Sequence, residues 1–143
     1  PQEVALLDSR KSINFAKTIS VPVLGVVENM SGYTIRGKSE PNSKVSIMGP
    51  GGVPIDCLTD NEGMWEVTLD VFKSGGGEES SRELEVPFLG SLPFDPGIVR
   101  GGDDGVHRII AEPEGETAKA FQSIVEGIVE QLEKGSQRSL RII

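Results

Sequence analysis

The chain of 143 residues contains little cysteine, little histidine and no excess of positive charge. Its one cysteine, Cys57, excludes an internal disulfide and any all-cysteine metal site built from one copy of the chain. This scarcity is typical of a reducing, cytoplasmic compartment. The formal net charge of −8 argues against nucleic acid or an anionic membrane as partner, since either would need a basic face.

Long apolar runs are also missing. No stretch approaches the roughly 20 apolar residues that a membrane span needs, and no signal peptide is recognisable. The chain begins Pro-Gln-Glu without Met and within a helical pattern, so we expect an N-terminal portion to precede it. The hydrophobic share of 36% and the charged share of 25% are typical of a globular domain with a core.

Helical and buried-strand patterns alternate on both sides of the chain's centre. Residues 2–19 carry apolar side chains at helical spacing, and the run from Pro22 to Val27 is apolar on both faces. Such a run predicts a parallel strand that is covered on both sides. The sequences VPVLGVV and VPFLGSL, each preceded by a helical pattern, predict an α/β fold: part of a doubly wound parallel sheet.

The remaining segments of this α/β pattern follow in order. We expect a Gly-rich loop and a helix over 74–85, a second strand with its exit loop over 86–96, a short helix or turn over 96–105, an amphipathic helix over 116–134 that ends at Gly135, and a tail over 136–143.

Residues 33–71 follow a different pattern of short alternating strands separated by turns, which predicts a β-meander. The pattern resembles bacterial immunoglobulin-like and carboxypeptidase-regulatory-like repeats. The matching residues are Gly37, Glu40, Pro41, Val45, Ile47, Thr59, Asp60, Gly63, Trp65, Val67 and Leu69. We therefore expect an α/β domain over 1–32 and 72–135, interrupted by a β-rich insertion over 33–71.

The flanks carry a second resemblance. The motifs V-E-N-M-S-G (27–32) and G-G-G-E (75–78), each between a strand and a helix, resemble the C-terminal half of the Mrp family. These proteins, also called ApbC or nucleotide-binding-protein carriers, are ATP-binding iron–sulfur cluster carriers of the deviant-Walker P-loop class. The resemblance implies cluster assembly as the function, ATP as cofactor, and a homodimer and apo iron–sulfur proteins as partners.

Two departures from the family limit what the resemblance implies. The P-loop with two lysines and the Asp-rich switch are not found, so we expect the chain not to hydrolyse ATP alone. The family's C-x-x-C pair, which holds a [4Fe–4S] cluster across two subunits, is replaced by the β-rich residues 33–71. A cluster requires four thiolates, so the resemblance does not extend to cluster binding here.

Three residues are candidates for the base side of an ATP site. The resemblance makes Asn29, at the end of the first strand, the residue that reads adenine; the alternative is a turn Asn that caps the strand exit. Pro93 and Asp95 follow the second strand, where related ATPases pack on adenine and ribose. The alternative for Asp95 is a helix N-cap, with Pro96 at the first helical position.

Other conspicuous residues favour structural roles. A phosphate site at Gly75–Gly77 would be opposed by Glu78 and Glu79, so we interpret the loop as structural. Cys57 is interpreted as a small core residue of a strand, with a metal role as the alternative. We expect no other metal ligand, a surface role for His107, a core role for Trp65, and solvated carboxylates at Asp103, Asp104, Glu112, Glu114 and Glu116.

Two further interpretations stay open. The chain could be a non-catalytic interaction module whose immunoglobulin-like insertion binds a partner, or the product of a chimaeric or truncated reading frame. In either case half of a parallel sheet would leave an open strand edge and an uncovered face.

Overall fold

The computed structural model describes the backbone of residues 3–140 and the side chains of residues 3–135. Seven elements form the α/β part: α1 (Glu3–Thr18), β1 (Val26–Glu28), α2 (Gly76–Glu83), β6 (Phe88–Ser91), α3 (Pro96–Asp104), α4 (Arg108–Ala111) and α5 (Glu116–Leu140). Residues 33–71 form the β segment, with β2 (Tyr33–Lys38), β3 (Lys44–Met48), a 3-10 turn η1 (Pro50–Gly52), β4 (Pro54–Leu58) and β5 (Met64–Leu69).

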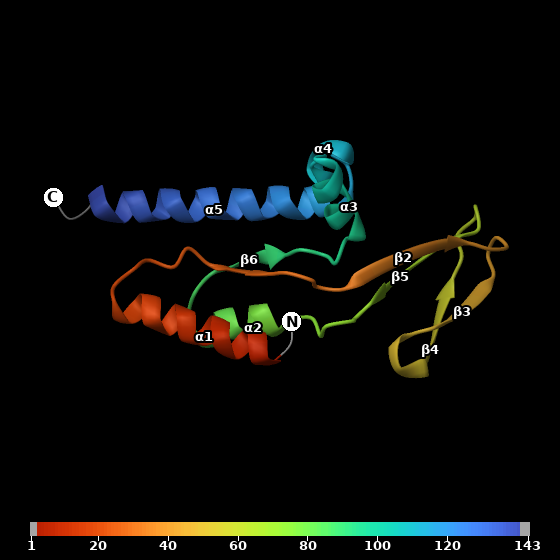
Figure 1. The fold of residues 1–143 in the computed structure, drawn as a ribbon, viewed down its shortest axis with the longest axis horizontal. Coiled ribbons are helices and arrows are strands. Elements are labelled where there is room, and N and C mark those ends of the chain that lie inside the picture. The colour runs from red at the N-terminus through yellow and green to blue at the C-terminus, as the bar shows by residue number, and fades with distance from the viewer. Residues whose placement is uncertain (1–2, 141–143) are drawn as a thin grey trace.

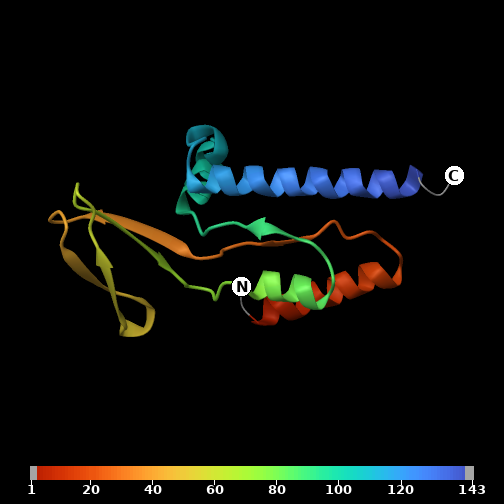
Figure 2. The same ribbon diagram turned by 180° about the vertical axis from the view of Figure 1, so that it is seen from behind.

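The α/β part has three layers. Strands β1 and β6 pair in parallel, with Val26 opposite Phe88 and Glu28 opposite Ser91. Helix α5 lies on one face of this pair, and α1 and α2 lie on the other (Figures 1 and 2). The mixed α/β class is therefore confirmed, while a doubly wound sheet beyond these two strands stays a prediction.

Strand β1 is shorter than the apolar run that predicts it. Only Val26–Glu28 are in the strand, although the run begins at Pro22. Pro87 precedes the partner strand and has no N–H to donate, which limits pairing at this end; its carbonyl still accepts from Val26 N at 2.8 Å.

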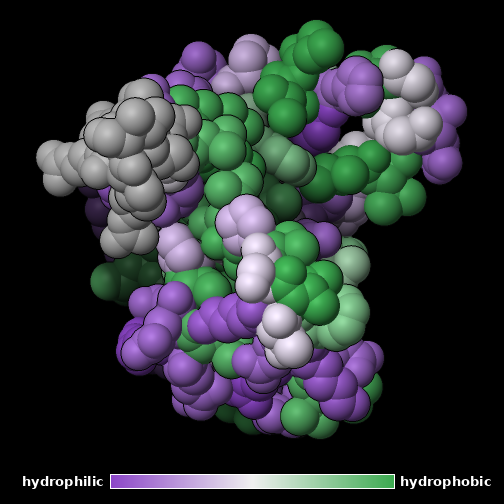
Figure 3. All heavy atoms as spheres, turned by 90° about the vertical axis from the view of Figure 1, so that its left-hand side faces the viewer, coloured by the Kyte–Doolittle hydropathy of each residue, from purple (hydrophilic) through white to green (hydrophobic). Residues whose placement is uncertain are grey.

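The apolar run is also not covered on both sides. Leu24 and Val27 are exposed, so this prediction is wrong for part of the run. The buried apolar side chains among the described residues are Leu6, Ala118 and Ile124, which is a small core. Apolar surface shows on the face drawn in Figure 3. Exposed apolar side chains of α1, of the loop after it and of α5 include Phe15, Ile19, Val21, Val129 and Leu132.

The β segment contains the four predicted strands, but its pairing corrects the predicted meander. Strand β2 pairs antiparallel with β5, and β3 pairs antiparallel with β4. The β3–β4 hairpin thus lies between β2 and β5 in the sequence, but it forms a separate two-stranded sheet instead of continuing a sequential one. Figure 1 shows β2 and β5 leaving the α/β layers together, with β3 and β4 at the far end.

Helix boundaries agree with the patterns except at glycines. Helix α2 begins at Gly76, so two of the three loop glycines lie in its first turn. Helix α5 continues through Gly135 to Leu140, which makes both the predicted end and the separate tail at 136–140 wrong; residues 141–143 lie outside the described part. A glycine costs a helix only about 1 kcal/mol relative to alanine, and no proline follows it. No helix within the described residues is long and apolar enough to cross a membrane.

Candidate functional site

The carboxyl ends of β1 and β6 place two exit loops side by side. Leu92, at the end of β6, donates its N–H to the carbonyl of Glu28 at 2.7 Å and accepts from Ser31 N at 2.9 Å. Two residues later, Phe94 N donates to the carbonyl of Gly32 at 2.8 Å. Open α/β sheets bind ligands beyond this edge of the strands, so these loops form the candidate site.

Asn29 lies on the first of these loops with an exposed side chain. Its Oδ1 accepts a hydrogen bond from Met30 N at 2.8 Å, and Met30 adopts a left-handed φ of 60°. Asn29 therefore serves as the turn residue that the alternative interpretation predicts. Its amide nitrogen makes no hydrogen bond within the described part of the chain, so a donor remains for a ligand.

Glu28, one residue earlier, is a site residue that the sequence patterns did not reveal. Its side chain is only 2% exposed. Oε1 accepts from Ser31 Oγ and from Gly75 N, both at 2.9 Å, and Oε2 accepts from Gly77 N at 2.5 Å. This carboxylate therefore holds the Gly-rich loop against the first exit loop.

The bonds to Glu28 explain the Gly-rich loop. Gly75 has a φ of 88°, which favours glycine, and a Cβ on Gly77 would lie 2.9 Å from Glu28 Cβ. The N–H groups that could cradle a phosphate hold an internal carboxylate instead, which agrees with the structural interpretation.

The electrostatics of Glu28 follow from this arrangement. Burial alone raises the pKa of the Glu28 carboxyl. The N–H groups of Gly75 and Gly77 and the hydroxyl of Ser31 stabilise the charged form more strongly, so the pKa lies below its ordinary value of 4.5.

A pocket of about 310 Å³ opens beside the second exit loop. Pro93 and Asp95 line it, whereas Asn29 does not, so the structure brings together two of the three predicted residues. The rest of its wall comes from the start of β2, from α4 and from residues 114–117.

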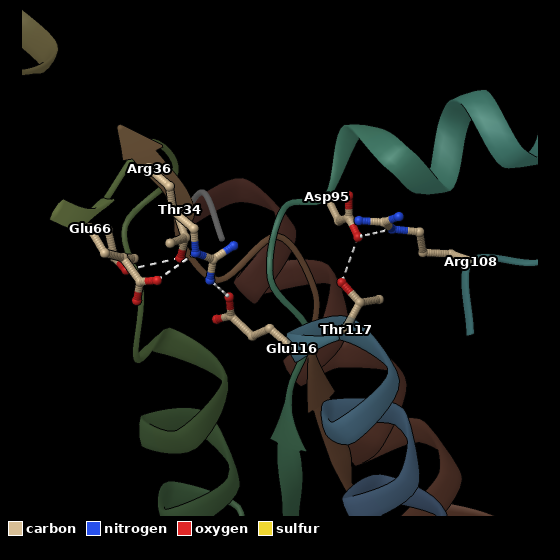
Figure 4. Close-up of polar contacts among 8 residues, drawn as sticks. Thr34, Arg36, Glu66, Asp95, Arg108, Glu116 and Thr117 are labelled. Carbon is tan, nitrogen blue, oxygen red and sulfur yellow. Dashed lines mark hydrogen bonds and ion pairs between the residues drawn. The ribbon is translucent and has the colours of Figure 1, made fainter. Parts of the chain in front are cut away.

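Asp95 is fully engaged by protein groups. Its Oδ1 accepts from Gly97 N at 2.7 Å, which caps α3 as the alternative interpretation predicts. Its Oδ2 accepts from Arg108 Nε and from Thr117 Oγ1, both at 2.7 Å (Figure 4). Burial raises the pKa of the Asp95 carboxyl, but these three hydrogen bonds outweigh it and hold the pKa below 3.8.

A second polar cluster faces Asp95 from the β segment. Arg36 on β2 donates through Nε to Glu66 Oε2 at 2.5 Å and through Nη2 to Glu116 Oε2 at 3.4 Å (Figure 4). Glu116 therefore contacts protein across the pocket, whereas Glu112 pairs with Arg108 four residues before it in the chain. Glu112, Glu114 and Glu116 are all exposed, as predicted, although they also line the pocket.

Aromatic contacts hold the second exit loop to the base of the β segment. The Phe94 ring packs edge-to-face on Tyr33, with centroids 5.6 Å apart, and on Phe72 at 5.8 Å. Because Tyr33 begins β2 and Phe72 follows β5, the loop and the two outer strands are fixed to one another.

The sequence of Gly32 to Ser39, GYTIRGKS, matches the letters of a P-loop. A P-loop requires a loop that opens a helix. Here residues 33–38 form the extended strand β2, paired with β5. The match therefore does not provide a phosphate site.

The other singled-out residues do not form a metal centre. Cys57 is half-buried on β4 opposite Val45, and no cluster of three or more His, Cys, Asp or Glu ligands occurs within the described residues. A [4Fe–4S] cluster needs four thiolates, so these residues do not fit one. His107 is exposed, and Trp65 is half-buried on β5 opposite Gly37.

Comparison with known proteins identifies the family. A model described as ParA, NUBPL iron-transfer P-loop NTPase, matches residues 1–54 and 60–129. Relatives include an "Iron-sulfur cluster carrier protein" of Synechocystis sp., 38% identical over 90% of this chain and 29% of its own length. A protein of the same name from Methanocaldococcus jannaschii is 32% identical over 93% of this chain and 36% of its own length.

A "Cytosolic Fe-S cluster assembly factor NUBP2 homolog" of Trichoplax adhaerens is 34% identical over 90% of this chain and 38% of its own length. The chain thus spans between 29% and 38% of the length of these three relatives. With the family model matching most of the chain, the protein belongs to the ParA/NUBPL family of iron-transfer P-loop NTPases.

Proposed function

We propose that this chain is part of an ATP-binding iron–sulfur cluster carrier and supplies the base side of its nucleotide site. The observation that carries the proposal is the hydrogen-bonded pair of exit loops at the carboxyl ends of β1 and β6. This is where ligands bind in open α/β sheets. The names of the relatives support the carrier function.

Each candidate residue has a distinct role in this proposal. The free amide nitrogen of Asn29 donates to the edge of adenine, while its Oδ1 keeps the turn at Met30. Pro93 offers the base an apolar surface. Asp95 contacts no ligand but fixes the loop through its bonds to α3, α4 and α5.

Phosphate chemistry lies outside these residues. Phosphoryl transfer in this class needs a P-loop lysine and a Mg²⁺ ligand, and the described residues supply neither in the required context. The chain alone therefore binds the nucleoside part of ATP without turnover.

The proposal for partners and cargo follows the family resemblance of the sequence. The chain works as part of a homodimer that delivers clusters to apo iron–sulfur proteins in the cytoplasm, without nucleic acid or membrane. One cysteine per chain gives a dimer two thiolates, against the four that a [4Fe–4S] cluster requires. The cluster is therefore cargo that the cysteines of two such chains do not hold alone.

Calorimetric titration with ADP tests the base side. Replacing Asn29 with Ala should weaken binding roughly two- to tenfold, the value of one hydrogen bond, whereas Asn61→Ala on an exposed turn of the β segment should leave it unchanged. Equal affinity for both variants contradicts the role of Asn29. ATP turnover by the purified chain that Asn29→Ala abolishes contradicts the absence of phosphate chemistry.

A second candidate is an interaction module in which the β segment binds a partner. The observation in its favour is a group of exposed apolar side chains on and around the β3–β4 hairpin: Met48, Val53, Leu58 and Met64. Calorimetric titration with ADP separates the candidates. Binding that Asn29→Ala weakens favours the carrier part, and absence of binding by the folded chain favours the module.

A further inference from the structure

The pocket beside Pro93 has one wall from each part of the molecule. Tyr33, Thr34 and Arg36 come from β2, and the opposite wall comes from α4 and the start of α5. Its volume of about 310 Å³ is at the lower end for small-molecule sites. A ligand in this pocket would therefore contact the β segment and the α/β part at once.

The charges of the lining favour an uncharged ligand moiety. Arg36 and Arg108 face four lining carboxylates, and each arginine already pairs with two carboxylates. The excess negative charge repels a polyphosphate. Tyr33, Pro93 and Phe94 instead offer apolar surface to a base. The carboxylates other than Asp95, those of Glu112, Glu114 and Glu116, can accept from sugar hydroxyls.

The two ion pairs of Arg36 differ in strength and in what they join. The pair with Glu66 lies within the β segment, between directly opposed residues of β2 and β5, at 2.5 Å. The pair with Glu116 spans from β2 to the start of α5 at 3.4 Å, and both of its members line the pocket. The longer pair is the one that an incoming ligand meets.

We propose that the Arg36–Glu116 ion pair closes the pocket and that a nucleoside separates it on entering, which couples occupancy of the pocket to the position of the β segment. This rests on the proposed function, in which the base lies between Pro93 in the pocket and Asn29, which is on the neighbouring exit loop and does not line the pocket. A ribose hydroxyl that donates to Glu116 replaces the guanidinium of Arg36, which stays with Glu66. By linkage, whatever moves the β segment then alters nucleoside affinity in return.

Trp65 provides a reporter for this coupling. It is the only tryptophan in the chain, it precedes Glu66 on β5, and it lies opposite Gly37, the neighbour of Arg36. Separation of Arg36 from Glu116 changes the surroundings of these strands, so the emission of Trp65 should change when a nucleoside binds.

Titration of the full chain with adenosine, followed by calorimetry and Trp65 fluorescence, tests the proposal. Arg36→Gln should bind adenosine about two- to fivefold more tightly, because it has no exposed ion pair to break on binding. Glu116→Gln should gain less, because it also removes the carboxylate that accepts from the ribose. The double variant should gain nothing beyond either single variant, since both remove the same pair. The emission change on binding should shrink in all three.

Lys44→Gln is the matched control, because it removes an ion pair with Asp56 in the same β segment but outside the pocket. It should behave as the unmodified chain. Unchanged or weaker binding in Arg36→Gln, or an undiminished emission change, would overturn the coupling and leave the proposed function standing. Failure of every form to bind adenosine would overturn the proposed base site and the coupling with it.

Discussion

The α/β part and the β segment are each organised around one buried polar side chain, but only one of these is ionisable. In the α/β part, the Glu28 carboxylate accepts from Ser31, Gly75 and Gly77. In the β segment, Thr59 Oγ1 accepts from Ser43 N at 2.8 Å and donates to the carbonyl of Glu40 at 2.6 Å. These side chains are 2% and 5% exposed, respectively.

Glu28 and Thr59 join parts of the chain that are separated by different distances in sequence. Glu28 binds N–H groups 47 and 49 residues away, so it fixes two loops whose relative position defines the candidate site. Thr59 joins the two corners of the β segment, 16 and 19 residues apart. Because the described part of the chain buries few apolar side chains, both regions depend on these hydrogen bonds to an unusual degree.

The largest expected effect is that of Glu28→Gln. The amide group replaces one carboxylate oxygen by a donor, so a glycine N–H on the Gly-rich loop is left buried without an acceptor and faces a second donor. A buried unsatisfied group costs about 1–3 kcal/mol, and we expect a loss of about 3 kcal/mol in the free energy of unfolding. Urea denaturation measures it.

Glu79→Gln is the matched control for Glu28. It makes the same change on the exposed surface of the first turn of α2, so its effect should stay within about 0.5 kcal/mol. If the two variants unfold at the same urea concentration, Glu28 does not organise the α/β part.

The same comparison predicts a pH dependence that comes mainly from the α/β part, since the carboxyl with a lowered pKa in the β segment, Asp56, is exposed. The pKa of Glu28 is lowered on folding, so its contribution is complete above its unfolded pKa of 4.5 and is lost as the pH falls through the lower folded pKa. Asp95 adds a similar loss below 3.8. Urea unfolding between pH 7 and pH 3 should show stability falling on the acid side, less steeply in Glu28→Gln. If the stability of the unmodified chain and that of Glu28→Gln fall with the same slope against pH, Glu28 is not a source of the pH dependence.

Local patterns were sufficient to predict most elements of both regions, but not helix α4. Apolar periodicity predicted α1, α5 and the parallel strands, and turn residues separated the four strands of the β segment. The sequence did not predict which of those strands pair. Strands β2 and β5 are brought together by contacts between residues far apart in sequence, such as Gly37 and Trp65. Gly135 shows the opposite limit. This glycine predicted the end of the helix, but the long amphipathic helix continues past it to Leu140.

The candidate site was predictable in part for the same reason. Asn29, Pro93 and Asp95 each follow a predicted strand, so the sequence alone was enough to single them out. The role of Glu28 could have been suspected only from an acidic residue at the end of an apolar strand, since its partners at Gly75 and Gly77 are distant in sequence. The pocket was not predictable, because Arg36 reaches Glu116 only through the pairing of β2 with β5 and the folding of the exit loop.

Removing the hydrogen bonds of Thr59 in the β segment should lower the free energy of unfolding less than removing those of Glu28 in the α/β part. Thr59→Val keeps the shape of the side chain but leaves Ser43 N without its acceptor, at a cost of about 2 kcal/mol. This loss should not vary between pH 7 and pH 3, since no charge is involved. Thr68→Val removes the exposed hydroxyl pair with Thr34, at 3.0 Å, and should cost well under half as much. Equal losses would show that burial of Thr59 is unimportant.

The smallest expected effect is that of Gly37→Ala, which tests packing in the β segment instead of hydrogen bonding. An added Cβ would lie 2.2 Å from Trp65 Cζ2, so the ring must move off the strand. The ring is only half-buried, so the cost should be about 1 kcal/mol, at the low end for overpacking. Its emission maximum should shift to the red as the indole meets more water. Gly102→Ala on the exposed side of α3, where nothing lies within 4 Å, should not destabilise the fold and should leave the emission unchanged. An unshifted emission in Gly37→Ala would mean that Trp65 does not pack on β2.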